Sequence, residues 1–467
     1  MQTEISSSTK KLLLIIMITG TFFSTLNQTL LNVALSDLMI IFDVNTSTIQ
    51  WLATGFMLVN GVLVPITAYL MKRFSTRQLF ISSLLFLLIG SIVAACANNF
   101  GVLLTGRMIQ AVGAGIIIPL MMTVIVYLYP AEERGAVMGK IGFAIIFAPA
   151  IAPTLAGFVL EYLSWRWLFI MMIPFVAVII ILASKYLVNV AETTKTKLDI
   201  VSVIYSTVGF GFVLFGFSSA GSRGWDDLVV ITSIIGGLFV TLLFCHRQIK
   251  SAEPLLNLNV FKFKVFTMTS IVNIAITILM YTDLILLPIY LQDGRGFTAL
   301  DAGLLLLPGA IINAMLSPVT GKLFDKFGAK PLFILGTGLI AISMFAVIDL
   351  SSETTTIYVL VRTIILRIGL AFITMPLNTA ALNALPKELA SHGSAINNTV
   401  RQLAGAIGTA VIMTIYTIQL VSVSLESNTD YISAASNTYF FMFIISIIAF
   451  IITWFTPKRQ LNLVKYD

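Results

Sequence analysis

Fourteen long apolar stretches divide this chain almost from end to end, and they place it among helical membrane proteins. The hydrocarbon core of a bilayer is ~30 Å thick and needs about 20 helical residues, so each stretch is long enough to cross it. Helices are expected because a spanning helix satisfies its own backbone polar groups where water is absent. The composition agrees, with 58% hydrophobic and 10% charged residues. The expected spans are 12–35, 48–71, 79–97, 101–128, 135–160, 166–188, 199–220, 228–247, 265–292, 303–321, 331–349, 355–383, 394–420 and 436–457.

The positive charges collect in alternate gaps between these stretches, which predicts how the chain is oriented. If both termini are cytoplasmic, 21 of the 28 Lys and Arg residues lie in cytoplasmic segments. The outward loops then hold only Arg166, Arg223 and Arg295, and the remaining four lie within spans (Arg107, Arg362, Arg367 and Arg401). This imbalance is what the positive-inside rule predicts for an even number of spans. The net charge of +7 therefore reflects topology, and we expect no nucleic-acid partner.

Matching motifs indicate that the chain has two related halves. A cytoplasmic turn follows the second span, and a similar one, from Gly321 to Lys330, follows the tenth span. Each turn is followed about 35 residues later by an arginine within a span, first Arg107 and then Arg362. We therefore expect a first six-helix bundle over residues 1–192 and a second over 251–467, with two additional helices over 193–250.

The second of these turns contains residues suited to a tight connection. Gly321 lets two helices approach closely, and Gly328 permits a left-handed backbone conformation. Asp325 is expected to cap the N-terminus of the next helix or to pair with a neighbouring base, while Lys326 keeps the loop on the cytoplasmic side. The pattern fits either a structural turn or a latch that closes a cytoplasmic gate. The first turn, which contains Arg73, lacks the acid and both glycines, so a latch there must be weaker or different.

Several motifs, taken in order, resemble those of the major facilitator superfamily. The second turn looks like its GxLxDxxGxK turn, and Leu104 to Gly113 resembles its RxxQGxG motif, with Ala111 replacing a glycine. Ala148 to Gly157 is similar to the antiporter motif of the fifth helix. Together they look like the fourteen-helix drug:proton antiporters of the EmrB/QacA type, most closely the lincomycin-resistance-like members.

The resemblance implies an all-α integral membrane protein with the major facilitator fold. Its two six-helix bundles would surround a central cavity that opens alternately to each side of the membrane. We expect a monomer in a bacterial plasma membrane with both termini in the cytoplasm. Its partners would be lipophilic drugs or related small molecules, protons and the lipid bilayer.

Asp283 is the sharpest indication of mechanism, because it is the only one of the 21 acidic residues well inside an apolar span. A carboxylate in hydrocarbon is costly, so this side chain should face the bundle interior or water. It is our candidate proton carrier, and the nearby Tyr281 is our candidate for the substrate cavity. The alternative is a neutral, hydrogen-bonded acid that stabilises packing.

Asn27 occupies the position in the first span where the family pattern usually places an aspartate. An amide cannot take up and release a proton near neutrality. Asn27 and Asp283 precede their respective cytoplasmic turns by similar distances, 45 and 42 residues, so we expect them at quasi-symmetric places. Protonation would then have moved from the first half to the second. Gln28 and Asn32 continue a polar stripe that either lines an aqueous cavity or bonds a neighbouring helix.

Arg107 lies within the fourth span, with Gln110 one turn along the same face. A guanidinium at this depth needs an acid, carbonyl groups or water as partners. The resemblance implies that Arg107 takes part in proton coupling, and we place Gln110 in the substrate cavity. Arg362 and Arg367 have the same interpretation, with Arg362 nearer the outer surface.

Two further groups are candidates for gating. Pro149, Pro153 and Gly157 form one line along the fifth span, which suits either generic close packing or a helix that bends and rocks against a partner. Asn398 and Arg401 share one face of the thirteenth span. We place Asn398 in the substrate cavity, and Arg401 either extends to the cytoplasmic surface or takes part in gating.

The sequence predicts a secondary active exporter driven by proton entry, and not an enzyme. It contains no phosphate-binding GxxxxGK[ST] loop, which disfavours ATP-driven pumping. Cys96 and Cys245 lie apart, and His246 and His392 are expected to be solvated, so we expect no metal site and no cofactor. The open alternatives are an exporter of one endogenous metabolite, lipid or fatty acid, an uncoupled facilitator or channel, and a membrane sensor.

Overall fold

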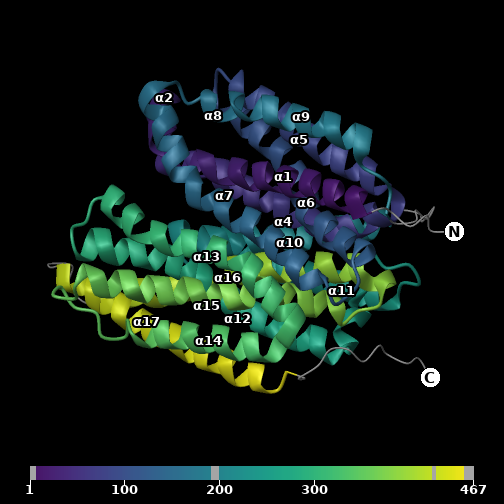
Figure 1. Cartoon of the computed structure of the whole chain (residues 1–467). Coiled ribbons are helices and arrows are strands. Elements are labelled where there is room, and N and C mark those ends of the chain that lie inside the picture. Colours follow the sequence, from purple (N-terminus) through teal and green to yellow (C-terminus); the bar gives the residue numbers. More distant parts are fainter. Residues whose placement is uncertain (1–6, 191–198, 423–427, 457–467) are drawn as a thin grey trace.

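Long helices run side by side through the computed structural model, which describes residues 7–190, 199–422 and 428–456 (Figure 1). No strand occurs among these residues. Within the same ranges, thirteen helices are long and apolar enough to cross a membrane, and one further apolar helix, Ala329–Phe345, is shorter. The expected all-α membrane fold is confirmed, and the shorter helix corresponds to the eleventh expected span.

The first half is a bundle of long helices with short helical segments near their ends. Two of the long helices begin at a residue whose side chain accepts from a free backbone N–H group: the Ser75 hydroxyl accepts from Gln78 in a capping box, and the Asn99 amide oxygen accepts from Val102. The long helices are α1 (Ser7–Leu30), α4 (Trp51–Arg73), α5 (Thr76–Ala95), α6 (Phe100–Leu128), α7 (Arg134–Tyr162) and α9 (Met172–Tyr186). The short segments are η1 (Leu31–Ala34), α2 (Leu35–Ile41), α3 (Thr46–Ile49) and α8 (Trp167–Ile170).

The second half repeats this arrangement after a connector that contains η2 (Leu258–Lys262). Its first long helix, α12, ends in a π-helical turn, η3 (Tyr290–Gly294), just after Pro288. The long helices are α12 (Lys264–Ile289), α13 (Ala299–Phe327), α14 (Ala329–Phe345), α15 (Thr356–Asn383), α16 (Ala390–Ser422) and α17 (Asn428–Trp454), with η4 (Lys387–Leu389) before α16.

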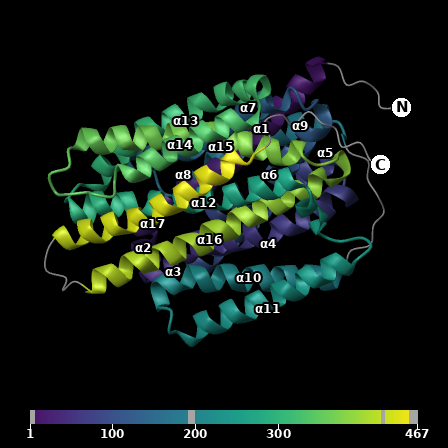
Figure 2. The same cartoon turned by 90° about the horizontal axis from the view of Figure 1, so that it is seen from below.

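Two additional helices form a hairpin between the halves in sequence. They are α10 (Ile200–Arg223) and α11 (Leu228–Lys250), each capped by the aspartate that precedes it, Asp199 and Asp227. Figure 2 shows the hairpin along one side of the molecule, beside α4 of the first half and α16 of the second. The halves also meet where α7 packs against α13. The two halves also meet directly where α4 packs against α16, next to the hairpin. We call the two places of contact the α4–α16 seam and the α7–α13 seam.

The two ends of the molecule differ in charge. The turns at 73–76 and 327–329 lie at one end, together with the start of α1 and the finish of α17. There the Lys330 ammonium group donates to the Trp454 carbonyl at 2.5 Å, and the Tyr129 hydroxyl donates to the Lys10 carbonyl at 3.5 Å. We call this the basic end. The loops of the opposite end carry Arg166, Arg223 and Arg295.

The outer faces of the bundle are apolar, as a lipid environment requires. Leu242 of α11 is 68% exposed, Phe345 of α14 is 64% exposed and Ile181 of α9 is 63% exposed. In water such a surface would be unstable, because each exposed apolar side chain forgoes its burial energy of about 1.5–3 kcal/mol. The inner faces form one large apolar core in the second half and two in the first half, one of which extends to Met375, Leu382 and Ala390 of the second half.

The charge difference between the ends predicts the orientation in the membrane. In a variant with Cys96 and Cys245 replaced by serine, Arg223→Cys should react in intact cells with a maleimide that cannot cross membranes. Arg73→Cys should react only after the membrane is opened, because the positive-inside rule places the basic end in the cytoplasm. The reverse labelling pattern would show that the orientation is wrong.

Candidate functional site

Asp283 of α12 and Arg362 of α15 form an ion pair inside the second half. The Arg362 guanidinium donates through Nη1 to Asp283 Oδ1 at 2.6 Å, and both side chains are 1% exposed. The Tyr439 hydroxyl of α17 donates to the same oxygen at 3.2 Å, and its ring centre lies 5.0 Å from the guanidinium carbon. Asp283 therefore faces the bundle interior and not lipid.

The Asp283 carboxylate is only partly satisfied. Its second oxygen, Oδ2, is buried and has no hydrogen-bond partner among the described residues. Asp283 does not line either of the two cavities described below. The carboxylate is thus closed off from both cavities in this conformation, while one of its oxygens is free to accept a further hydrogen bond or a proton.

Arg107 of α6 occupies a comparable buried place in the first half, but its partners are neutral. Arg107 is 0% exposed, and its Nη1 donates to Asn27 Oδ1 and to the Asn27 carbonyl, both at 3.1 Å. The same nitrogen donates to Gln110 Oε1 at 3.0 Å, and Gln110 in turn donates to the Ser91 hydroxyl at 2.9 Å. The guanidinium also lies over the Phe56 ring, 4.5 Å from its centre. Carbonyl and amide oxygens, not a carboxylate, hold this charge.

The two arginine centres are related by the repeat. Asn27 and Arg107 are 80 residues apart, and Asp283 and Arg362 are 79 residues apart. In each half the polar residue of the first long helix meets the arginine of the fourth long helix. This geometry agrees with the expected quasi-symmetry of Asn27 and Asp283, and the first centre has an amide where the second has an acid.

At the basic end, Asp325 of α13 binds across the α7–α13 seam. Its carboxylate oxygens accept from the backbone N–H groups of Gly135, at 2.8 Å, and Ala136, at 2.7 Å, in the first turn of α7. A carboxylate there is favoured, because the first N–H groups of a helix lack partners inside it. We expected Asp325 to cap the next helix or to pair with a base, and that expectation is wrong. Asp325 caps a helix of the other half.

Glycines allow this close contact. A Cβ atom on Gly321 would lie 2.1 Å from the carbonyl oxygen of Gly135, so any side chain here would force α7 and α13 apart. Gly328 ends α13 with a φ of +78°, the left-handed region expected from the sequence. Arg73 and Lys326 are exposed at this end. The first turn bonds differently, since Arg77 donates to the Ser184 carbonyl within the first half.

Other hydrogen bonds join the halves at the basic end. The Arg134 guanidinium donates to Asn383 Oδ1 at 2.7 Å, the Tyr127 hydroxyl donates to the Lys387 carbonyl at 3.1 Å, and the Ser394 hydroxyl donates to the Pro119 carbonyl at 3.0 Å. Further along α7, away from this end, a Cβ atom on Gly157 would meet nothing within 4 Å. Several hydrogen bonds therefore join the two halves at the basic end, in addition to those of Asp325.

The larger of the two cavities lies between the halves, along the α4–α16 seam. It has a volume of about 570 Å³ and is lined by α4, α10, α12 and α16 with Gln28 of α1. The residues that α4 and α12 contribute, such as Thr54 and Tyr281, lie near the opposite end of those helices. None of its described lining residues is Asp, Glu, Lys, Arg or His. A cavity of this size and polarity suits a small, largely apolar molecule.

The family is decided by comparison with known sequences. The family model described as "Major Facilitator Superfamily" matches residues 17–409. The chain belongs to the major facilitator superfamily. This transporter is 46% identical over 405 residues to the MFS-type transporter YhcA of Bacillus subtilis (strain 168), which covers 87% of this chain and 76% of YhcA. It is 41% identical over 418 residues to the lincomycin resistance protein LmrB of the same organism, covering 89% and 86% of the two chains.

A solved structure supports the fold of the transporter. The proton:xylose symporter XylE, bound to 6-bromo-6-deoxy-D-glucose, superposes with a TM-score of 0.68 over 97% of each chain at 16% identity. At that identity the likeness speaks for the fold alone. Members of this family are transporters, so the expectation that the chain is not an enzyme is confirmed.

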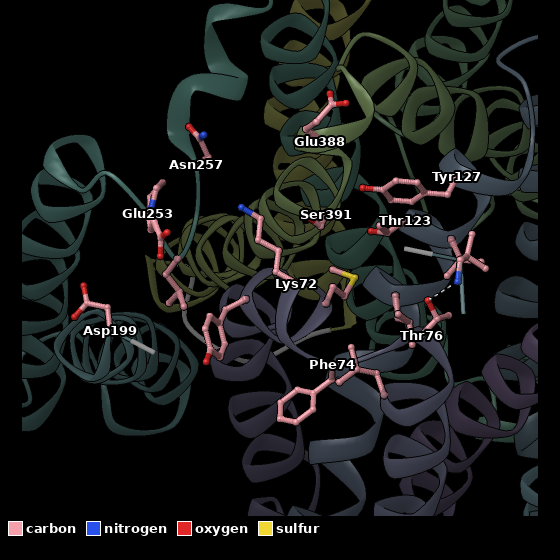
Figure 3. Close-up of a pocket in the computed structure, with 18 of the residues that line it drawn as sticks. Lys72, Phe74, Thr76, Thr123, Tyr127, Asp199, Glu253, Asn257, Glu388 and Ser391 are labelled. Atoms are coloured by element: carbon pink, nitrogen blue, oxygen red, sulfur yellow. Dashed lines mark hydrogen bonds between the residues drawn. The ribbon is translucent and has the colours of Figure 1, made fainter. Parts of the chain in front are cut away.

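A second, smaller cavity of about 440 Å³ lies at the basic end of the transporter. Figure 3 shows the Lys72 side chain in it, among Glu253, Asn257, Glu388 and Ser391. These residues come from α4, the connector, η4 and α16, so this cavity adjoins both halves and the segment between them. Its lining is charged, in contrast to that of the larger cavity.

The candidate residues for the substrate cavity are not all brought together. Gln28 and Tyr281 line the larger cavity, whereas Asn27 and Gln110 belong to the Arg107 centre. Asn398 lines neither cavity; its amide oxygen accepts from Arg401 at 3.1 Å. Asn32 lies in η1, and its side chain is outside the described residues.

His392 and Arg362 are both buried in the structure. His392 is not solvated as expected: it is 1% exposed, and its Nδ1 accepts from the backbone N–H of Asn257 at 3.2 Å. Arg362 lies within two turns of the outer end of α15, yet it is fully buried because Asp283 and Tyr439 surround it.

No group of three or more His, Cys, Asp or Glu side chains able to hold a metal occurs in the described part of the chain.

Removing the Asp325 carboxylate should open the basic end. Hydrogen bonds to a charged group contribute about 1.5–3 kcal/mol, so Asp325→Ala should shift the ratio of closed to open molecules by roughly tenfold or more. Spin labels on Glu132→Cys and Lys326→Cys, with Cys96 and Cys245 replaced by serine, would report the distance distribution across the seam. Asp349→Ala, an exposed acid of the same half, should leave that distribution unchanged. If Asp325→Ala gives the same distance distribution as the parent, Asp325 does not hold the basic end closed.

Proposed function

We propose that this chain is a proton-coupled exporter of amphipathic small molecules, including antibiotics, that works by alternating access. The observation that carries the proposal is the buried Asp283–Arg362 pair, because it places an ionisable carboxylate next to a fixed positive charge inside a membrane transporter. The relatives named for lincomycin resistance support an antibiotic as substrate. The uncharged cavity between the halves supports substrates that are largely apolar.

In the proposed cycle, Asp283 alternates between two states. As a carboxylate it holds Arg362 and Tyr439, which ties α12 to α15 and α17. Once protonated it loses most of its attraction for the guanidinium, so the three helices are free to repack. Because Asp283 lines neither cavity here, proton exchange requires a rearrangement that opens a water path to it, first from the outside and then from the cytoplasm. Substrate release would accompany protonation, and substrate uptake would accompany deprotonation.

The Asp325 contacts supply the complementary gate. If the basic end is cytoplasmic, the present conformation is closed to the cytoplasm by the hydrogen bonds of Asp325, Arg134 and Tyr127. Opening towards the cytoplasm would break them. The N-terminal turn of α7 would then be uncapped until the halves close again. Pro149 and Pro153 in the same helix leave backbone carbonyls unpaired and let it bend.

The energy available from protons is adequate for this task. One charge that crosses a potential of 100 mV supplies about 2.3 kcal/mol. Each tenfold concentration ratio costs about 1.4 kcal/mol, so one proton per neutral substrate sustains a ratio on the order of 40-fold.

Asp283→Asn should abolish transport driven by a pH gradient in proteoliposomes, because an amide cannot carry the proton. This variant also leaves Arg362 buried without a counter-charge, which costs about 3–5 kcal/mol of stability. The double variant Asp283→Asn with Arg362→Gln removes both charges and should regain stability while remaining uncoupled. The exposed Glu353→Gln variant is the matched control and should transport normally. Full pH-driven transport by the double variant would exclude Asp283 as the proton carrier.

Asn27→Asp should restore a carboxylate beside Arg107, where its oxygen would lie about where Asn27 Oδ1 now lies. With a second ionisable centre, the number of protons moved per substrate should rise, or cationic substrates should be favoured. The ratio is measured from the membrane potential that stops net substrate flux at a known pH gradient. Asn45→Asp adds the same charge at an exposed position and should change nothing. If Asn27→Asp alters neither quantity, the hypothesis of a relocated proton site is wrong.

A further inference from the structure

One side of the larger cavity is made by the hairpin, not by the two bundles. Leu214, Phe217 and Ser218 of α10 line it, together with Trp225 of the loop between α10 and α11. Facing residues come from α4, α12 and α16. Figure 2 shows α10 next to both α4 and α16, so it covers the seam between the two halves at this cavity.

The hairpin is held to the second half at the opposite end. The Trp225 indole N–H donates to the Thr414 hydroxyl of α16 at 2.6 Å. The Phe217 ring packs edge-on against the indole, with centres 5.9 Å apart and planes at 76°. Two aromatic rings with one polar anchor thus form a fixed corner of the cavity, since the hydrogen bond sets the orientation of the indole.

The hairpin is also held at the basic end. Arg247 of α11 donates to both carboxylate oxygens of Asp199, at 2.8 and 2.9 Å, which closes the hairpin and lowers the pKa of that carboxyl to about 2. The pair therefore stays charged at physiological pH. Gln248 donates to the Ser202 hydroxyl at 2.7 Å and accepts from the backbone N–H of Leu256 in the connector at 3.2 Å. These bonds fix the position of α10 along its axis relative to the connector and the second half.

Against the first half, α10 makes close apolar contacts. A Cβ atom on Gly61 of α4 would lie 2.6 Å from a methyl carbon of Leu214, and one on Gly211 would lie 3.5 Å from a methyl carbon of Val62. The Trp51 and Phe215 rings stack with centres 5.8 Å apart. The absence of a side chain at Gly61 lets Leu214 pack closely against α4, so α10 closes the side of the cavity with carbon surface.

From these contacts we infer that the α10–α11 hairpin is a substrate-contacting wall of the transporter, with Phe217 and Trp225 as its specificity-determining residues. The substrate class is an uncharged amphipathic molecule with a flat apolar ring system. The rings provide faces for stacking, and the lining offers hydroxyl and amide groups but no charge to pair with an ionic substrate. This inference rests on the proposed function, because it takes the larger cavity to be the substrate site.

The test compares two phenylalanines of the same helix. Phe217 lines the cavity, whereas Phe212 is 49% exposed on the outer face of α10. Binding of Nile red, an uncharged planar dye, is measured by fluorescence titration of the purified full-length protein. Phe217→Ala should raise the dissociation constant about tenfold, the size of effect expected when a stacking contact and its buried area are lost. Phe212→Ala should leave it unchanged.

Ethidium, a planar cation, tests the charge preference with the same protein. It should bind at least tenfold more weakly than Nile red to the parent, and Phe217→Ala should change its binding little. The inference that the hairpin contacts the substrate would be refuted if Phe217→Ala left Nile red binding unchanged. It would also be refuted if Phe212→Ala weakened Nile red binding as much as Phe217→Ala does. Equal affinity of the parent for both dyes would overturn the substrate class.

Binding and transport are measured separately so that the two proposals can fail separately. If Nile red binding depends on Phe217 but no pH-driven transport occurs in proteoliposomes, proton-coupled export is refuted and the substrate contact of the hairpin still stands. If proton-coupled transport occurs and Phe217→Ala does not alter it for any dye, the substrate contact of the hairpin is refuted and proton-coupled export still stands.

Discussion

The buried pair of Asp283 and Arg362 sets the conditions that the rest of the second half must meet. Two charges away from water are tolerated only when they neutralise each other and find hydrogen bonds. Here they do so by joining three helices, since Asp283 lies on α12, Arg362 on α15 and Tyr439 on α17. Any change in the charge of Asp283 therefore alters how these helices pack. The proposed proton-coupled mechanism rests on that link between the ionisation of Asp283 and helix packing.

The first half shows how the same scaffold holds an arginine without an acid. Arg107 is surrounded by the Asn27 amide and carbonyl, by Gln110 and by the face of Phe56. Each of these groups stabilises a cation weakly, and together they satisfy the guanidinium at a fixed geometry. The two halves thus share a framework and differ in chemistry at one position. One half surrounds its arginine with neutral groups, and the other pairs its arginine with a carboxylate.

Much of this arrangement was predictable, and the missing part was a matter of contacts between distant segments. Hydrophobic length predicts the spans, the lysine-rich turns predict their orientation, and the similar offsets of Asn27 and Asp283 predict their related places. The same spacing argument would have paired Arg362 with Asp283, because Arg107 lies equally far from Asn27. Asp325 could not be assigned to α7 from local pattern, since its partner N–H groups lie about 190 residues away in the other half. The burial of His392 could not be predicted from its place near the basic end, because it depends on the connector, whose Asn257 N–H donates to His392 and whose Leu255 and Leu256 are buried.

The position of α10 also bears on how the molecule meets the bilayer. Two bundles related by a repeat would present two similar seams to lipid, but the hairpin covers only the α4–α16 seam. Among the described residues no helix covers the α7–α13 side, where Phe158 is 61% and Met315 is 66% exposed. The protein is therefore lopsided in the plane of the membrane. A hydrophobic compound that diffuses within a leaflet meets a helical barrier on one flank and a bare junction between bundles on the other.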